Sequence, residues 1–260
     1  MLNYIYDGTF EGFLTVIDIL WNIDVQNILI SNARNYQPNL FDDPIVITTD
    51  PAKACNQMEI LRKYPRDVFE DISYCFISEE PGIELIILEY FKRLAGCSPA
   101  DINRFRENFA DNTIKKVRDL ARKVSYEITR FHGFVRFRQL LNGVYYATIA
   151  PDYNIVQFLA PHFTARFADQ NWLIHDLKRR TGIYYETDRN RCVYLPLLEA
   201  NPNLNNQISN IVYNQQDNLF QELWNAYFHE IAITERINKK LQRQRIPKRY
   251  WKNLVERIED

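Results

Sequence analysis

The sequence predicts an α+β fold, an antiparallel meander of about five strands packed with many helices. Three observations favour this class. Apolar residues recur at spacings of three and four in several long segments, which is the period of an amphipathic helix. Alternating segments flank Asn142-Gly143, a dipeptide typical of a two-residue hairpin turn. Three more short alternating segments lie between Trp172 and Leu195, separated by polar turns.

The helices are expected at intervals along the chain. Asp7-Gly8-Thr9 supplies a cap before the apolar pattern from Phe10 to Trp21, and Asp50-Pro51 starts another helix after a short strand at 45–49. The longest amphipathic pattern runs from Asn112 to Phe131 and has strongly basic outer faces. Further helical patterns cover 68–76, 81–94, 158–167 and 219–231.

The hairpin is expected to pair Phe134–Leu141 with Val144–Ala150. A two-residue loop pairs Leu141 with Val144, so that Arg138 faces Ala147 and Arg136 faces Ile149. Because strand side chains alternate between faces, Arg136 and Arg138 then share one face with Tyr145. One face of the hairpin is therefore predicted to be basic and the other apolar.

The charge of the chain divides into two halves. Residues 1–111 contain 9 basic and 18 acidic residues, whereas residues 112–260 contain 23 basic and 15 acidic residues, which together give the total of −1. We expect an acidic, mainly helical part at 1–111 and a basic α+β part at 112–260, or one continuous domain with this asymmetry. The basic half is a candidate for an anionic partner, and two solvated faces of opposite sign are the alternative.

Several classes of protein are excluded by what the sequence lacks. No apolar run is long enough for a membrane-spanning helix, and the N-terminus has no signal-peptide pattern, so we expect a cytoplasmic protein without a membrane partner. The seven glycines form no phosphate-binding or dinucleotide-binding motif. The cysteines are isolated, which favours reduced thiols, no metal site and no cofactor. They are Cys55, Cys75, Cys97 and Cys192.

The four histidines are the obvious places to look for catalysis. They are His132, His162, His175 and His229, and no two of them have a metal-ligand or metalloprotease spacing. His175 and Asp176 are strand neighbours, so their side chains point to opposite faces and do not form a dyad. His132 and His175 remain the catalytic candidates, and hydrogen-bonded structural histidines are the alternative.

The positive signal is a set of basic residues interleaved with aromatic ones. Arginine binds phosphate through two hydrogen bonds, and aromatic rings can stack on bases, so this mixture suits a nucleic-acid surface. The alternative is that the aromatics belong to the core and the arginines to a solubilising face. The candidate nucleic-acid-binding residues are Arg136, Arg138, Tyr145, Arg166, Trp172, Lys178, Arg179, Arg180, Lys248, Arg249 and Trp251.

Several separated motifs resemble, in order, a bacterial family of uncharacterised DNA-metabolism proteins that accompany a radical S-adenosylmethionine (SAM) protein. Related domains are fused to a uracil-DNA-glycosylase-like domain. The motifs are Tyr6–Leu14, Phe134–Phe137, Ala160–Phe163 with Arg166–Ala168, Trp172–Asp176 and Pro247–Leu254. The resemblance implies a DNA repair or modification context and a radical SAM partner. It implies no reaction, because the family has no established activity.

These observations together predict an accessory DNA-binding component of a DNA repair or modification system. The chain lacks the Cx₃Cx₂C motif of a radical SAM enzyme and an obvious glycosylase motif, so we expect it to be neither enzyme itself. Two alternatives stay open. One is a protein-interaction subunit that docks through its acidic half without touching DNA, and the other is an enzyme acting on a nucleobase through His132 or His175.

Overall fold

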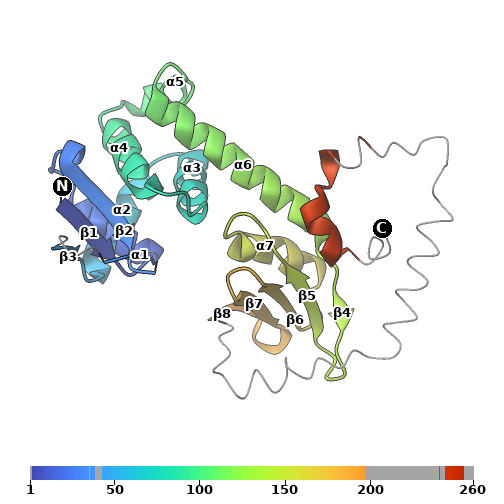
Figure 1. The fold of residues 1–260 in the computed structure, drawn as a ribbon. Coiled ribbons are helices and arrows are strands. Elements are labelled where there is room, and N and C mark those ends of the chain that lie inside the picture. The colour runs from blue at the N-terminus through green and yellow to red at the C-terminus, as the bar shows by residue number, and fades with distance from the viewer. Residues whose placement is uncertain (1, 35, 39–42, 197–239, 241–243, 255–260) are drawn as a thin grey trace. The chain divides into compact units, whose positions relative to one another are not determined.

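The fold was analysed in a computed structural model, which describes residues 2–34, 36–38, 43–196, 240 and 244–254. The described residues form seven α-helices, a parallel three-stranded sheet and a mostly antiparallel five-stranded sheet (Figure 1). The predicted α+β class is therefore confirmed. The apolar pattern at 219–231, including His229, lies outside the described residues. No helix in the described ranges combines the length and apolar character needed to cross a bilayer.

The chain packs as two compact units, Met1–Ser125 and Tyr126–Asp260. The boundary between them falls inside helix α6 (Asn112–Phe134). The change of charge after residue 111 therefore comes at the start of α6, and the change of packing unit comes further along the same helix.

The first unit contains a parallel sheet in the order β2-β1-β3. Its strands are β1 (Leu2–Tyr6), β2 (Ile28–Asn32) and β3 (Ile45–Val46). Of these three strands, only β3 was predicted from the sequence. Strand β1 was not predicted because it is nearly all buried and lacks the polar alternation of a half-exposed strand.

The described part of the first unit also contains five α-helices in addition to the part of α6 that belongs to it. They are α1 (Phe10–Ile19), α2 (Pro51–Arg62), α3 (Arg66–Ile77), α4 (Ile83–Ala95) and α5 (Ile102–Arg106). The predicted caps are confirmed, because Thr9 accepts a hydrogen bond from the Gly12 amide and Asp50 accepts from the amides of Ala52 and Lys53.

A buried ion-pair network joins three helices of the first unit. The Arg106 guanidinium of α5 pairs with Asp71 at 2.9 Å and Asp67 at 2.7 Å, both on α3. Arg118 of α6 reaches the other oxygen of Asp71 at 2.7 Å. Since Arg106 and Asp71 are both buried, each charge depends on the other for compensation.

Helix α6 extends through Phe134, where the sequence pattern predicted a strand. The reason is packing between residues three apart on a helix. Phe134 lies 6.0 Å from Phe131 between ring centroids, and Tyr250 packs on both rings. The expected strand is thereby reduced to β4 (Arg138–Gln139).

The hairpin register is one residue away from the predicted one. The turn is a three-residue loop closed by hydrogen bonds from Gly143 to Leu140 and from Leu140 to Val144, with Gly143 at a φ of 82°. Arg138 consequently faces Tyr146 instead of Ala147, and Gln139 faces Tyr145. A one-residue shift exchanges the two faces, so the prediction that Arg138 and Tyr145 share a face is wrong.

The second unit contains the five-stranded sheet in the order β4-β5-β6-β7-β8. The remaining strands are β5 (Tyr145–Ile149), β6 (Trp172–Asp176), β7 (Thr181–Glu186) and β8 (Arg191–Pro196). The predicted strand order is confirmed, but β5 and β6 are parallel. Helix α7 (Val156–Arg166) connects them, and a helical crossover returns the chain in the same direction.

One face of this sheet forms a core with α7. Trp172 and Ile174 of β6 have no exposed surface, and Tyr185 of β7 stacks on Trp172 at 5.5 Å between ring centroids. Phe163 of α7 lies 6.3 Å from the same tryptophan ring. These contacts fix β6 and β7, whose connecting turn carries basic residues.

Candidate nucleic-acid interface

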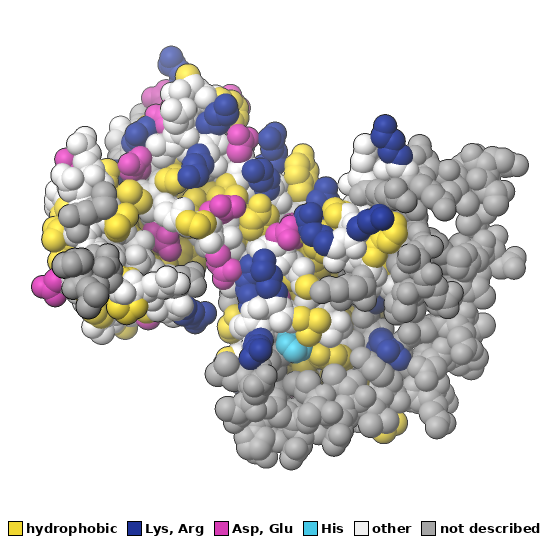
Figure 2. Space-filling model, in the orientation of Figure 1, with side chains coloured by type: hydrophobic (Ala, Val, Ile, Leu, Met, Phe, Trp, Pro, Cys, Tyr) yellow, Lys and Arg dark blue, Asp and Glu magenta, His cyan; other side chains and the backbone are white. Residues whose placement is uncertain are grey.

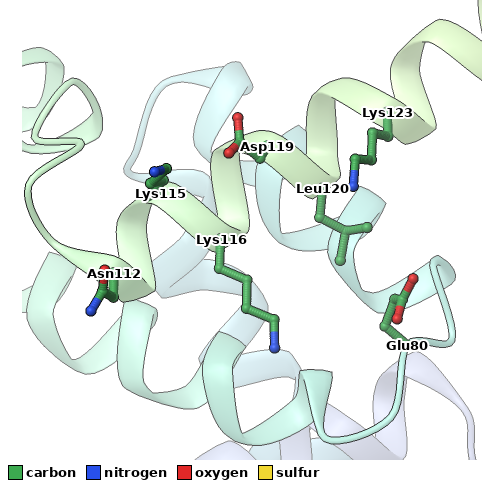
Figure 3. A pocket seen from close by; sticks show the side chains of 7 residues that line it. All are labelled: Glu80, Asn112, Lys115, Lys116, Asp119, Leu120 and Lys123. Atoms are coloured by element: carbon green, nitrogen blue, oxygen red, sulfur yellow. The ribbon is translucent and has the colours of Figure 1, made fainter.

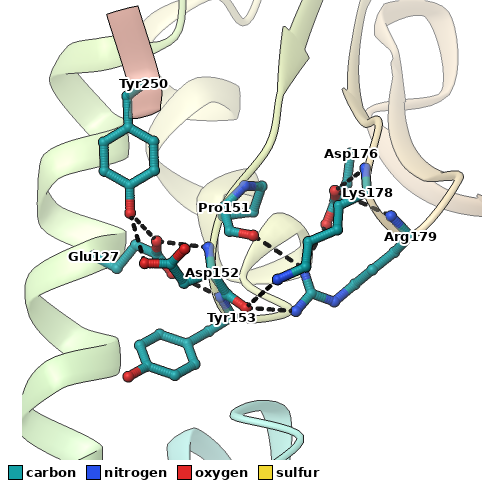
Figure 4. Close-up of polar contacts among 8 residues, drawn as sticks. All are labelled: Glu127, Pro151, Asp152, Tyr153, Asp176, Lys178, Arg179 and Tyr250. Carbon is teal, nitrogen blue, oxygen red and sulfur yellow. Dashed lines mark hydrogen bonds and ion pairs between the residues drawn. The ribbon is translucent and has the colours of Figure 1, made fainter. Parts of the chain in front are cut away.

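The loop between β5 and α7 is bound to α6 through a buried carboxylate. Glu127 accepts hydrogen bonds from the backbone amides of Asp152, at 2.8 Å, and Tyr153, at 2.9 Å (Figure 4). Glu127 is only 3 % exposed, so these amides provide the compensation that a buried carboxylate needs. The loop is thereby held in one conformation, with its carbonyl groups turned toward the β6–β7 turn.

The β6–β7 turn is fixed by the fully buried Asp176. This carboxylate accepts hydrogen bonds from the backbone amides of Lys178 and Arg179 and pairs with the Arg179 guanidinium at 3.0 Å. Arg179 also donates to the carbonyls of Pro151 and Asp152, and the Lys178 ammonium donates to the latter at 3.3 Å. The turn therefore lies against the β5–α7 loop.

A short 3₁₀ helix, Lys248–Asn253, reaches the same loop from the C-terminal part of the chain. Tyr250 is 2 % exposed and donates its hydroxyl to Glu127 and Asp152. Burial raises the pKa of Tyr250 above its ordinary value, and the Glu127 carboxylate raises it further, so the hydroxyl stays protonated. Arg249 pairs with Asp152 at 2.6 Å, and Lys248 lies 5.8 Å from the centre of the Trp251 ring.

Two basic segments that are distant in the sequence thus meet at Asp152. We call this arrangement the Asp152 cluster; it comprises the basic residues Lys178, Arg179 and Arg249, their sequence neighbours Arg180 and Lys248, and the carboxylates Glu127, Asp152 and Asp176. Five basic side chains stand against three carboxylates, so the cluster has an excess of positive charge. Because Glu127 and Asp176 are buried, the charges that reach the solvent are mostly cationic.

The members of the cluster fall into two groups by exposure. The Arg179 side chain is 11 % exposed and makes its contacts inside the protein, so it positions the turn. The Arg249 side chain is 55 % exposed, and Lys178, Arg180 and Lys248 are exposed as well. These four side chains can reach an anion in solution while their backbone is held in place.

Comparison with family models adds an assignment for this part of the chain. The model of a domain of unknown function, DUF4130, matches residues 81–256, which is more than half of the sequence. The chain belongs to the DUF4130 family. The DUF4130 match includes α6, the five-stranded sheet and the whole Asp152 cluster, whereas β1, β2 and β3 precede it. No curated protein matches the chain. The DUF4130 description itself states no activity.

The other predicted nucleic-acid-binding residues of the DUF4130 region lie outside the Asp152 cluster. Arg136 donates to the carbonyl oxygens of Gly133 and Val135, where it satisfies groups at the end of α6. Arg138 lies opposite Tyr146 on the sheet, and Tyr145 is on the opposite face. Arg166 is exposed at the end of α7, with its guanidinium 5.8 Å from the centre of the Phe167 ring.

The two tryptophans proposed for stacking differ in exposure. Trp172 is 0 % exposed and belongs to the core under the sheet, so the expectation that it stacks on a base is wrong. Its ring packs against Tyr185 and Phe163. The sequence pattern did not distinguish a core tryptophan from one that stacks on a base. Trp251 is partly exposed and donates its indole N–H to the Ile246 carbonyl at 2.9 Å. Trp251 therefore remains the stacking candidate.

The two catalytic candidates have different surroundings. The His132 ring stacks on His162 at 4.2 Å between centroids, and burial, with the charge of His162, lowers the pKa of His132. Nδ1 of His175 is hydrogen-bonded to the Tyr146 hydroxyl at 2.8 Å, and burial lowers its pKa as well. Both rings are therefore biased toward the neutral form. In the described ranges, no three His, Cys, Asp or Glu side chains gather in a way that would hold a metal ion.

Three residues that organise the Asp152 cluster were not among the candidates predicted from the sequence. Glu127 falls within the helical pattern from Asn112 to Phe131, Asp152 follows the predicted hairpin strand, and Tyr250 lies in the Pro247–Leu254 motif. The only sequence signal was that Tyr250 and Asp176 lie inside two of the motifs that carried the family resemblance. Their contacts join positions up to 123 residues apart, which a local pattern does not reveal.

Proposed function

We propose that this protein is an accessory DNA-binding component of a bacterial DNA repair or modification system. The observation that supports the proposal is the meeting of the Lys178–Arg180 turn and the Lys248–Arg249 segment at Asp152. Cationic side chains on a fixed backbone bind phosphates and release counterions, which is the main source of affinity for DNA.

The residues of the proposed interface have two different roles. Lys178, Arg180, Lys248 and Arg249 would contact phosphates, and Trp251 would stack on an exposed base. Arg179, Asp176, Glu127 and Tyr250 would hold the two segments in register without touching DNA. A strand with unpaired bases suits this arrangement better than a duplex, because a duplex offers no free base face to Trp251.

The radical SAM partner belongs to the same proposal, and only the sequence resemblance supports it. Co-purification with such a protein from the native cell, unchanged by nuclease treatment, is the expected result. Loss of the partner after nuclease treatment would show that DNA alone connects the two proteins, and absence of the partner would count against this part of the proposal.

The DNA-binding part is tested by fluorescence anisotropy of the full chain with labelled single-stranded and double-stranded DNA at several salt concentrations. We expect affinity to fall steeply as salt rises, with log Kd linear in log salt and a slope of about 0.7 per phosphate contact on a single strand. Absence of binding, or binding that does not change with salt, would overturn the proposal. A subunit that docks only to protein would show no DNA binding.

A further inference from the structure

The first unit contains a hollow of about 360 Å³ against the outer face of α6. Its lining residues are Glu80, Asn112, Lys115, Lys116, Asp119, Leu120 and Lys123. Figure 3 shows Lys116 and Lys123 on the two sides of Leu120, with Glu80 facing them from the loop before α4. Apart from Glu80, every lining residue comes from the same helix face, where positions recur at spacings of three and four.

The wall of this hollow is rigid at the start of α6. Asp111 accepts hydrogen bonds from the amides of Thr113 and Ile114, which caps the helix. The Asp111 carboxylate also pairs with Arg93 of α4, and the Thr113 hydroxyl donates to Glu89 of α4 at 3.1 Å. The first turn of α6 is therefore attached to α4, and the lysines that follow project from a fixed backbone.

The lysines of the hollow have no carboxylate partner among the described residues. Lys115, Lys116 and Lys123 are exposed and form no ion pair there, whereas Asp119 pairs with Arg122 at 3.1 Å. Figure 2 shows basic side chains along the course of α6, with acidic side chains among them. Three ammonium groups around one hollow favour an anionic ligand, since each can donate a charge-assisted hydrogen bond.

The acidic members of the lining narrow the choice of anion. Glu80 is placed by a loop with two left-handed residues, Glu79 at a φ of 56° and Gly82 at 73°. A carboxylate beside the lysines repels a continuous chain of phosphates, but it accepts hydrogen bonds from hydroxyl or amino groups. The buried side chain of Leu120 offers an apolar floor between the charges. A volume of about 360 Å³ lies at the lower end of the range of small-molecule sites.

We propose that this hollow binds a small phosphorylated ligand of mononucleotide size. Lys116 and Lys123 hold the phosphate, Lys115 adds a third positive charge, and Glu80 accepts a hydrogen bond from a hydroxyl or amino group of the ligand. This site lies wholly in the first unit and does not depend on DNA binding by the Asp152 cluster.

Isothermal titration calorimetry of the full chain with deoxyadenosine monophosphate, inorganic phosphate and deoxyadenosine tests the proposal. We expect the nucleotide to bind more tightly than phosphate and the nucleoside not to bind. The double variant Lys116→Gln/Lys123→Gln should weaken nucleotide binding about tenfold or more, because it removes two charge-assisted hydrogen bonds. The control Arg62→Gln/Lys63→Gln removes the same charge from exposed positions of α2 and its end, and it should leave binding unchanged.

The Glu80→Gln variant separates a specific site from general attraction. It should reduce the preference for the nucleotide over inorganic phosphate, since it removes the negative charge that strengthens the hydrogen bond from the ligand and that repels free phosphate. Equal effects of the two double variants, or no binding of nucleotide and phosphate, would overturn the proposal. A single-stranded oligonucleotide that outcompetes the nucleotide and depends on Lys116 and Lys123 would also overturn it, by making the hollow part of a polyanion surface.

Discussion

Arg249 pairs with Asp152 at 2.6 Å between Nη2 and Oδ2, and this ion pair joins the C-terminal 3₁₀ segment to the loop between β5 and α7. Both side chains are substantially exposed, at 55 % and 44 %. An exposed pair contributes little to stability, so Arg249 can exchange Asp152 for a phosphate at small cost. The same pair therefore orders the cationic surface and leaves it available to an anion.

The first prediction concerns the charge of Asp152. Asp152→Asn preserves the backbone carbonyl that Lys178 and Arg179 contact, but removes the carboxylate charge that competes for Arg249. We expect DNA affinity to increase a few-fold in anisotropy measurements at low salt. The control Asp169→Asn makes the same change of charge at an exposed position of the same unit. Weaker binding by Asp152→Asn would contradict an anion-binding role for this cluster.

The second prediction concerns the buried ion pairs of the first unit. Arg106→Leu leaves the buried Asp71 with Arg118 as its remaining partner, and we expect the free energy of unfolding to fall by about 3 kcal/mol. Urea unfolding followed by circular dichroism measures the loss. Arg66→Gln is the control, because its side chain is 89 % exposed and its pair with Glu70 should contribute less than about 0.5 kcal/mol. Equal stability of the two variants would show that the buried network is dispensable.

The third prediction concerns the pH dependence of stability. Burial lowers the pKa of His175 in the folded state, against an opposing effect of the Asp176 charge. The unfolded state then binds a proton first, so stability is complete above the ordinary histidine pKa of about 6.5 and decreases as pH falls through the folded-state pKa. The midpoint of thermal unfolding, measured in buffers from about pH 5 to about pH 8, should show this decrease in the wild type and a smaller one in His175→Gln. An unchanged profile in the variant would assign the decrease to other groups, such as His132.

The fourth prediction uses two glycines with different surroundings. A Cβ at Gly12 would lie 2.2 Å from Oδ1 of Asp7 and 2.9 Å from the Thr49 hydroxyl, whereas a Cβ at Gly133 would meet nothing within 4 Å. The Asp7 carboxylate accepts hydrogen bonds from Thr9 and Thr49 at the carboxyl ends of β1 and β3, and Gly12→Ala would displace it. We expect Gly12→Ala to lose about 1 kcal/mol and Gly133→Ala to gain about 0.5 kcal/mol in urea unfolding.

The pKa of Asp7 provides a second readout for Gly12→Ala. Burial raises this pKa, but the hydrogen bonds from Thr49 and Thr9 outweigh burial, so the pKa of Asp7 is lowered overall. Displacement of the carboxylate should bring the value back toward that of an ordinary aspartate in an NMR titration. A Gly12→Ala variant that keeps both its stability and a low Asp7 pKa would contradict the close packing at this position.

Local patterns predicted the features that depend on neighbouring residues. The caps at Thr9 and Asp50 follow from side-chain chemistry within a few positions, and the structure confirms them. The amphipathic stripe of α6 could likewise be predicted from spacing alone. Short polar turns join β4 to β5, β6 to β7 and β7 to β8, and these pairings followed from the sequence, whereas β5 and β6 are joined through α7.

Features that depend on distant contacts could not be predicted in the same way. The hairpin register depends on whether Asn142-Gly143 closes a two-residue or a three-residue loop, and both use the same dipeptide. The burial of Trp172 depends on Tyr185 and Phe163, which no local pattern connects to it. The meeting of Lys178 and Arg249 at Asp152 depends on Glu127 and Tyr250, whose hydrogen bond spans 123 residues.

The salt dependence of DNA binding by Lys178→Gln/Lys248→Gln tests the central claim most directly. Both lysines are exposed, and the control Lys63→Gln/Arg104→Gln removes the same charge from exposed positions of the first unit. If Lys178 and Lys248 contact phosphates, the variant should weaken single-stranded DNA binding and lower the slope of log Kd against log salt by about 1.4 relative to wild type and control. A slope equal to that of the control would contradict DNA binding at the Asp152 cluster.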